Sequence, residues 1–138
     1  MIYAVIDTNI IVSALLAKHE NSPSVQIVGR LFSGEITPLY SREIMDEYHK
    51  VLRRKKFSFP ETAINTMLGA IEQHGILVEP TVTNEILTDM KDLPFYEVVL
   101  EKRSDSAYLV TGNIKHFPSK PFIITARQML DIINNLAV

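Results

Sequence analysis

The stretch that decides the fold is residues 2–16, IYAVIDTNIIVSALL. Residues 2–6 are continuously apolar and include β-branched side chains, which is typical of a strand buried on both faces of a parallel sheet. Polar residues then interrupt the run, and from Thr8 or Asn9 to about Lys18 the pattern becomes helical. The stretch therefore predicts a buried strand that leads directly into a helix.

The same alternation continues along the chain. Further strands are expected at 37–40, 76–78, 108–110 and 122–124. Helices are expected from Ser22-Pro23 to Gly34, from Ser41 to the basic run 53–56, from Pro60 to His74, from Leu93 to Lys102 and from Ala126 to about Asn134. Because such strands join by right-handed crossovers, the pattern predicts a three-layer α/β/α fold with a mainly parallel central sheet. No repeat or linker divides residues 1–138, so we expect a single domain.

Composition limits the class of protein. Apolar residues make up 46% of the chain and charged residues 22%, as in soluble globular proteins. The absence of cysteine excludes a thiolate metal site and a cysteine nucleophile, and it agrees with a reducing cytoplasm. Asp7 and Asn9 interrupt the apolar amino terminus too early for a membrane span. We therefore expect a cytoplasmic protein with no membrane attachment, although its net charge of −2 lacks the basic excess of many nucleic-acid-binding proteins.

Ligands of open parallel sheets bind beyond the carboxyl ends of the strands. The residues that follow the expected strands are Asp7, Ser41, Glu79, Thr111 and Thr125. Asp7 stands out, because an apolar strand delivers its carboxylate straight to that edge. The alternative is that Asp7 or Thr8 only caps the helix that follows, a role that contributes about 1 kcal/mol.

Helical geometry adds two further acids. At about 100° per residue, Glu47 falls at the flank of the apolar stripe of its helix, where it either reaches the sheet edge or pairs with Lys50 or Arg54. Asp92 projects within about 20° of Val99, on the side facing the core, unless it serves as the cap of its own helix. Glu97 projects about 160° from Val99, so we expect it to face solvent.

Three acids at one sheet edge repel each other unless a cation neutralises them. Oxygen-only ligation favours Mg²⁺ or Mn²⁺ over zinc, and such a site supports phosphodiester hydrolysis. Another possible reaction at Asp7 is phosphoryl transfer through an aspartyl-phosphate. Haloacid-dehalogenase-like phosphatases, which use this reaction, carry a second acid two residues further on, where this chain has Asn9.

A run of cations follows the helix that carries Glu47. Three of them, Arg53, Arg54 and Lys55, are candidates to bind RNA phosphates. The alternative is that the run stabilises the carboxyl terminus of its helix and keeps an exposed tip soluble.

Four segments carry a resemblance to a known family: DTNIIVSAL at 7–15, SREIMDEYHKVL at 41–52, DLPFYEVVL at 92–100 and YLVTGNIKHFP at 108–118. In this order they resemble the successive motifs of PIN-domain proteins. The resemblance implies a Mg²⁺- or Mn²⁺-dependent endoribonuclease that cleaves single-stranded RNA, often as the toxin partner of an antitoxin protein. By position, Asp7, Glu47 and Asp92 match the first three acids of the family. Asn9 and Thr111 match polar residues that support its site.

The chain departs from that pattern at the fourth acid. The family usually carries it in or just after the TG turn, where this chain has Asn113 and His116, and Ala107 stands where many members have an aspartate. Asn113 can still ligate a metal through its amide oxygen. The departures keep open a catalytically weakened PIN-fold module that binds nucleic acid or protein. The apolar residues of the last helix are either core or a patch for a partner, including a second copy of the chain.

Overall fold

Five strands form one sheet in the structure, a computed structural model that describes residues 1–136. The strands are β1 (Ile2–Ile6), β2 (Ile36–Tyr40), β3 (Ile76–Leu77), β4 (Tyr108–Val110) and β5 (Ile123–Ile124). They lie in the order β3-β2-β1-β4-β5, and each neighbouring pair is parallel. The prediction of a parallel central sheet is therefore confirmed.

Strand β1 occupies the centre because it is apolar on both faces. Ala4, Val5 and Ile6 are all 0% exposed, and Val5 pairs with Leu39 of β2 on one side and Leu109 of β4 on the other. The chain builds outward from β1 through β2 and β3, and then in the opposite direction through β4 and β5. The switch in direction lies at the carboxyl ends of β1 and β4, where parallel sheets bind ligands.

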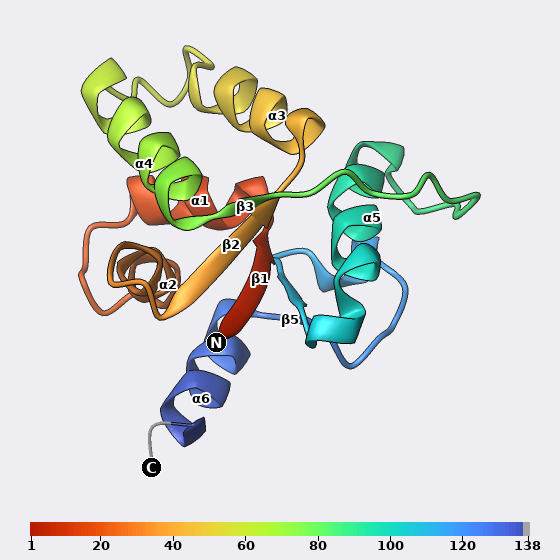
Figure 1. Ribbon diagram of the computed structural model, residues 1–138. Coiled ribbons are helices and arrows are strands. Elements are labelled where there is room, and N and C mark those ends of the chain that lie inside the picture. The colour runs from red at the N-terminus through yellow and green to blue at the C-terminus, as the bar shows by residue number, and fades with distance from the viewer. Residues whose placement is uncertain (137–138) are drawn as a thin grey trace.

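Helices cover both faces of the sheet. They are α1 (Thr8–Leu16), α2 (Pro23–Phe32), α3 (Arg42–Leu52), α4 (Glu61–His74), α5 (Leu93–Glu101) and α6 (Ala126–Leu136). Helices α1, α2 and α4 lie on one side of the sheet and α5 lies on the other (Figure 1), with α6 packed against α2. This arrangement confirms the predicted three-layer α/β/α fold. No helix of residues 1–136 is long and apolar enough to cross a membrane.

The helices start where the sequence indicates, although the Ser22 side chain makes no capping hydrogen bond to α2, and the ends of the elements differ by one or two residues. The Ser41 side chain caps α3 by accepting a hydrogen bond from the backbone N–H of Ile44 at 3.2 Å. Gly34 has a φ of +83°, the left-handed conformation that lets the chain turn after α2. The strand expected to reach Val78 ends at Leu77, although the Val78 N–H still donates to Tyr40.

The last helix mainly belongs to the core. Met129, Leu130 and Ile133 are buried, whereas Leu136 is 68% exposed. Of the two alternatives for these apolar residues, burial within the chain therefore accounts for most of the helix.

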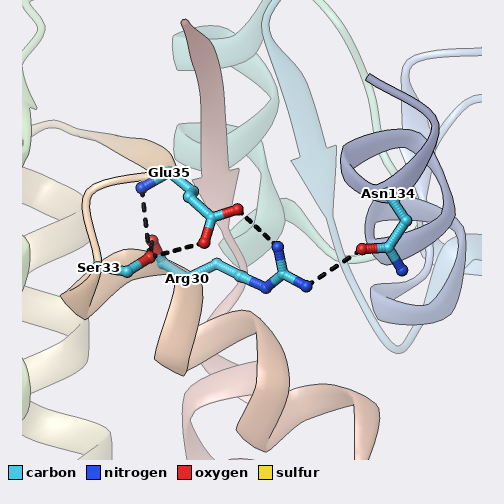
Figure 2. A network of polar contacts seen from close by, with 4 residues as sticks. All are labelled: Arg30, Ser33, Glu35 and Asn134. Carbon is cyan, nitrogen blue, oxygen red and sulfur yellow. Dashed lines mark hydrogen bonds and ion pairs between the residues drawn. The ribbon is translucent and has the colours of Figure 1, made fainter. Parts of the chain in front are cut away.

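A polar network fastens α6 to the rest of the molecule (Figure 2). Arg30, near the end of α2, pairs with Glu35 at 2.6 Å and donates to the Asn134 side chain of α6 at 3.1 Å. The Ser33 hydroxyl donates to the same Glu35 carboxylate at 3.1 Å. Because Glu35 immediately precedes β2, the network lies at the amino-terminal edge of the sheet, opposite the expected site. Its groups are exposed, so we expect each ion pair to contribute less than about 1 kcal/mol.

Candidate active site

A cavity of about 690 Å³ opens at the carboxyl edge of the sheet. It is lined by residues from α1, α3, the approach to α5 and the TGN turn after β4. The acids in its wall are Asp7, Glu47, Asp89 and Asp92, and the other polar side chains include Asn9, Arg54, Lys91, Asn113 and His116. The structure therefore brings the three expected acids to one cavity, and it adds Asp89.

Asp7 stands at the amino-terminal cap position of α1, but its side chain makes no capping hydrogen bond. Its Oδ2 atom instead accepts a hydrogen bond from the Thr111 hydroxyl at 2.7 Å and one from the Asn9 side-chain amide at 3.3 Å. Only 5% of the residue is exposed. The capping alternative for Asp7 is therefore wrong, because Thr111, the residue that follows β4, holds the carboxylate and the helix does not.

The electrostatics of Asp7 follow from this burial. Burial raises the pKa of Asp7, the Thr111 hydrogen bond lowers it, and the nearby charges of Asp92 and Glu47 raise it; the net effect is a rise from 3.8 to about 6. Burial of a carboxylate disfavours its charged form, and neighbouring negative charges act in the same direction. Asp7 is thus a group that a cation would stabilise.

Glu47 is held by α1 and not by its own helix. The Thr8 hydroxyl donates to Glu47 Oε2 at 2.5 Å, and the side chain is half-buried in the cavity wall. Within the described part of the chain, Glu47 forms no ion pair with Lys50 or Arg54, the other interpretation of its position. The hydroxyl that follows Asp7 therefore links the first two acids.

Asp92 ends a short 3₁₀ turn (Met90–Asp92) that leads into α5, and its side chain does not cap that helix. Its Oδ2 atom is buried and has no hydrogen-bond partner within residues 1–136. The His116 ring lies beside it, with Nδ1 3.4 Å from that oxygen, and this proximity lowers the pKa of Asp92. Burial and the charge of Asp89 outweigh that effect, so the net pKa of Asp92 is raised.

The polar residues around Asp7 form a chain of hydrogen bonds through the TGN turn. Asn9 accepts from the Gly112 backbone N–H at 3.0 Å, and the fully buried Thr111 hydroxyl accepts from the Asn113 N–H at 3.0 Å while it donates to Asp7. Because Asn9 and Thr111 each contact both Asp7 and the turn, they fix the carboxylate relative to Asn113.

The fourth corner of the cavity holds Asn113 and His116, neither of which is acidic. Asp89 lines the same cavity and supplies a further negative charge close to Asp92, whose pKa it raises. Asp89 accepts a hydrogen bond from the Lys91 N–H at 3.0 Å. A turn-forming aspartate three residues before Asp92 is the sequence signal that indicates this position.

The expectation that Glu97 faces solvent is wrong. Glu97 is half-buried, and its Oε2 atom accepts hydrogen bonds from the backbone N–H of Thr83 at 2.6 Å and from the Thr83 hydroxyl at 3.0 Å. The helical phase of Glu97 is correct, but the segment between β3 and α5 returns along the outer face of α5 and covers it.

The structure separates the three basic candidates. Arg54 lines the cavity. Arg53 is engaged by Glu61, with its Nε atom 2.8 Å from Oε1, and it also contacts the His49 side chain at 2.8 Å. Lys55 and Arg53 line a neighbouring surface groove near Ser58 and Phe59, which Arg54 also borders, and neither of them lines the acidic cavity. Of the three, only Arg54 faces the acids.

The donor chemistry of the cavity fits a hard divalent cation. The oxygens that it offers are those of carboxylates, one of which is buried without a hydrogen-bond partner, and burial together with the neighbouring acids raises the pKa of Asp7. Within residues 1–136, however, no group of three or more His, Asp or Glu side chains is close enough to hold a metal ion together. The acids share a cavity but not a ready coordination sphere, so binding requires them to draw together.

A parallel α/β sheet with aspartates and a glutamate at its carboxyl edge defines the class of fold. The sequence model of the PIN domain matches residues 3–115, a stretch that contains Asp7, Glu47, Asp92 and Asn113. The chain belongs to the PIN-domain family, whose members are generally nucleases that typically use divalent metals. No curated protein and no solved structure matches the chain.

Proposed function

We propose that this protein is a metal-dependent endoribonuclease that cleaves single-stranded RNA, with Asp7, Glu47 and Asp92 as its catalytic carboxylates. The observation that carries the proposal is the burial and the raised pKa of the Asp7 carboxylate. It is a buried carboxylate whose pKa is raised to about 6 by burial and by two acids of the same cavity, and Thr111 and Asn9 hold it in place. Perturbed carboxylates in a cleft are a mark of functional sites.

Asp7, Glu47 and Asp92, with the Asn113 amide oxygen, are the groups that would hold Mg²⁺ or Mn²⁺. When bound, such an ion polarises the scissile phosphate, makes a water molecule more acidic and stabilises the leaving oxygen. The three acids supply the negative charge that retains the ion, and any one of them that stays free of it can accept the proton of the attacking water.

The remaining polar residues prepare the acids for this task. Thr111 and Asn9 orient Asp7 through hydrogen bonds of 2.7 and 3.3 Å, and Thr8 orients Glu47 at 2.5 Å. His116 Nδ1 lies 3.4 Å from Asp92 and keeps that side chain in the cavity wall. These hydrogen bonds come from separate parts of the chain and orient each acid toward the cavity, and metal binding then draws the acids together.

The test is cleavage of a labelled single-stranded RNA with Mn²⁺ and with EDTA. Asp92→Asn removes a charge but little volume, so we expect a fall in the cleavage rate of at least about 100-fold with an unchanged fold. Asp131→Asn, the same exchange on the exposed face of α6, is the matched control and should cleave as the unaltered chain does. Full activity in Asp92→Asn contradicts the proposed site.

The family resemblance extends the proposal to biology. We propose that the protein acts as the toxin of a toxin–antitoxin pair, in the cytoplasm where its RNA substrates are made. Expression of the chain alone should then arrest growth, and co-expression with the neighbouring open reading frame should restore it. Restoration by Asp92→Asn without any partner is the internal control for toxicity through the site.

A second candidate function rests on Asn113 and His116, which stand where the family usually carries its fourth acid. If Asn113 and the His116 ring prevent the acids from drawing together, the cavity binds nucleic acid or protein without cleaving it. Titration calorimetry with Mn²⁺ separates the two, because this alternative predicts no binding heat that is lost in Asp7→Asn.

A further inference from the structure

An aromatic turn forms part of the wall of the acidic cavity. Helix α3 ends at Leu52, and the chain then folds back through two turns, in which the Phe57 N–H donates to Arg54 at 3.1 Å and the Ser58 N–H donates to Lys55 at 3.2 Å. Ser58 has a φ of +54°, in the left-handed region that side chains other than glycine rarely adopt. Its hydroxyl donates to the same Lys55 carbonyl at 3.2 Å, which stabilises this conformation.

The Phe57 ring is the part of the turn that faces the site. It is half-buried and lines the same cavity as Asp7, Glu47 and Asp92. The Phe59 ring stacks on it, with centroids 5.2 Å apart and planes inclined by 10°. A backing ring limits the rotation of Phe57, so the cavity has one flat aromatic surface among the aliphatic and polar side chains of its wall.

Cations surround this flat surface. Lys56 Nζ lies 5.1 Å from the Phe57 ring centroid, and Arg54 and Lys91 line the same cavity. An aromatic face among positive charges fits a ligand that is planar and negatively charged, which is the chemistry of a nucleotide. Lys56 is exposed, so a base that stacks on the ring can displace its ammonium group toward solvent.

We propose that Phe57 is a nucleobase-stacking platform, which binds a base of single-stranded nucleic acid next to the phosphate that reaches the acids, while Arg54 and Lys91 contact the flanking phosphates. This inference rests on the proposed function for the position of the scissile phosphate. In a duplex both faces of a base are covered by its neighbours, whereas the ring requires a base with a free face. The platform therefore selects single strands and tolerates any base.

The absence of tryptophan from the chain allows a direct test of stacking. Phe57→Trp places a single tryptophan at the platform, and Phe32→Trp places one at an exposed phenylalanine on α2, outside the cavity. Each variant is titrated in EDTA with a short single-stranded RNA of mixed sequence and with the same backbone lacking bases. We expect the RNA to quench the tryptophan fluorescence only in Phe57→Trp, and only when the RNA carries its bases. Equal quenching by the abasic strand, or none at saturation, overturns the inference.

Affinity in EDTA provides the second test, by fluorescence anisotropy of the labelled RNA. Phe57→Leu keeps an apolar side chain but no flat ring, and we expect its affinity to fall by about 5- to 150-fold, while Phe57→Tyr binds like the unaltered chain. Phe32→Leu is the matched control. Unchanged affinity in Phe57→Leu, or no RNA binding by the unaltered chain at low salt, overturns the inference. Circular dichroism confirms that each variant is folded.

Salt dependence tests the phosphate contacts. Removing one phosphate contact in Arg54→Ala should lower the slope of log affinity against log salt concentration by about 0.7. Arg53→Ala should leave the slope unchanged, because that side chain is held by Glu61. Because all these measurements exclude metal, they do not require cleavage. A chain that binds through Phe57 and cleaves nothing with Mn²⁺ contradicts the proposed function alone, and cleavage with affinity independent of Phe57 contradicts the platform alone.

Discussion

Replacing Asp7 with asparagine should stabilise the metal-free protein while abolishing its activity. The pKa of Asp7 is raised from 3.8 to about 6, mainly by burial, so ionisation of Asp7 opposes folding. A shift of about two units corresponds to about 3 kcal/mol at 1.36 kcal/mol per unit. Asparagine is neutral at every pH and keeps an oxygen that can accept the Thr111 hydrogen bond.

The effect of Asp7 on the free energy of unfolding depends on pH, because the pKa of this group is higher in the folded chain than in the unfolded chain. Below about pH 3.8 Asp7 is protonated in both the folded and the unfolded chain, so its ionisation costs the folded state nothing. As the pH rises to about 6 and beyond, the unfolded chain ionises first, and the folded chain loses stability. The gain from Asp7→Asn should thus be only about 0.5 kcal/mol at about pH 4 and reach at most about 3 kcal/mol at about pH 8.

Urea unfolding in EDTA at both pH values measures this difference. Asp131→Asn on the exposed face of α6 is the matched control and should change the free energy of unfolding by less than about 0.5 kcal/mol. Adding Mn²⁺ should then stabilise the unaltered chain and not Asp7→Asn, because only a ligand that binds the folded state raises stability. If Asp7→Asn is no more stable than the unaltered chain at about pH 8, the carboxylate is well compensated and the argument is refuted.

Two further perturbations test the contacts around the site. Thr111→Val removes the hydroxyl that donates a hydrogen bond to Asp7. The free energy of unfolding should fall by about 1.5–3 kcal/mol at about pH 8, and by less at about pH 4, where Asp7 is mostly protonated in the folded chain. Equal losses at both pH values would contradict this. Glu97→Ala removes the acceptor of the Thr83 N–H. Hydrogen exchange of that amide should then become about 10- to 100-fold faster. Unchanged protection would mean that other contacts hold the segment.

Local sequence patterns determined the layers of the fold. The apolar run of β1 predicted a strand buried on both faces, and Ala4, Val5 and Ile6 are indeed inaccessible to solvent. Ser41 predicted the start of α3 and caps it. These features depend on a few consecutive residues, so the sequence is sufficient to predict them. The ends of the elements are less certain, because terminal residues fray.

Helical phase predicted the side on which an acid lies but not what meets it there. Asp92 was placed toward the core and is half-buried in the cavity wall. Glu97 was placed on the opposite side of the same helix, correctly, but that side is covered by the segment that carries Thr83. Phase is a property of one helix, whereas burial depends on what packs against it.

Asp7 is where the two sources of information divide most clearly. The sequence by itself determined that an apolar strand would deliver this carboxylate to the edge of a parallel sheet. A helix cap and a site residue occupy the same position there, so no local pattern distinguishes them. The tertiary structure decided between them, because β4 pairs with β1 and brings Thr111, 104 residues away, within 2.7 Å of Asp7. Phe57 likewise lies in the cavity beside the acids only because α3, which precedes it, packs against α1 and α5, and no spacing along the chain predicts this.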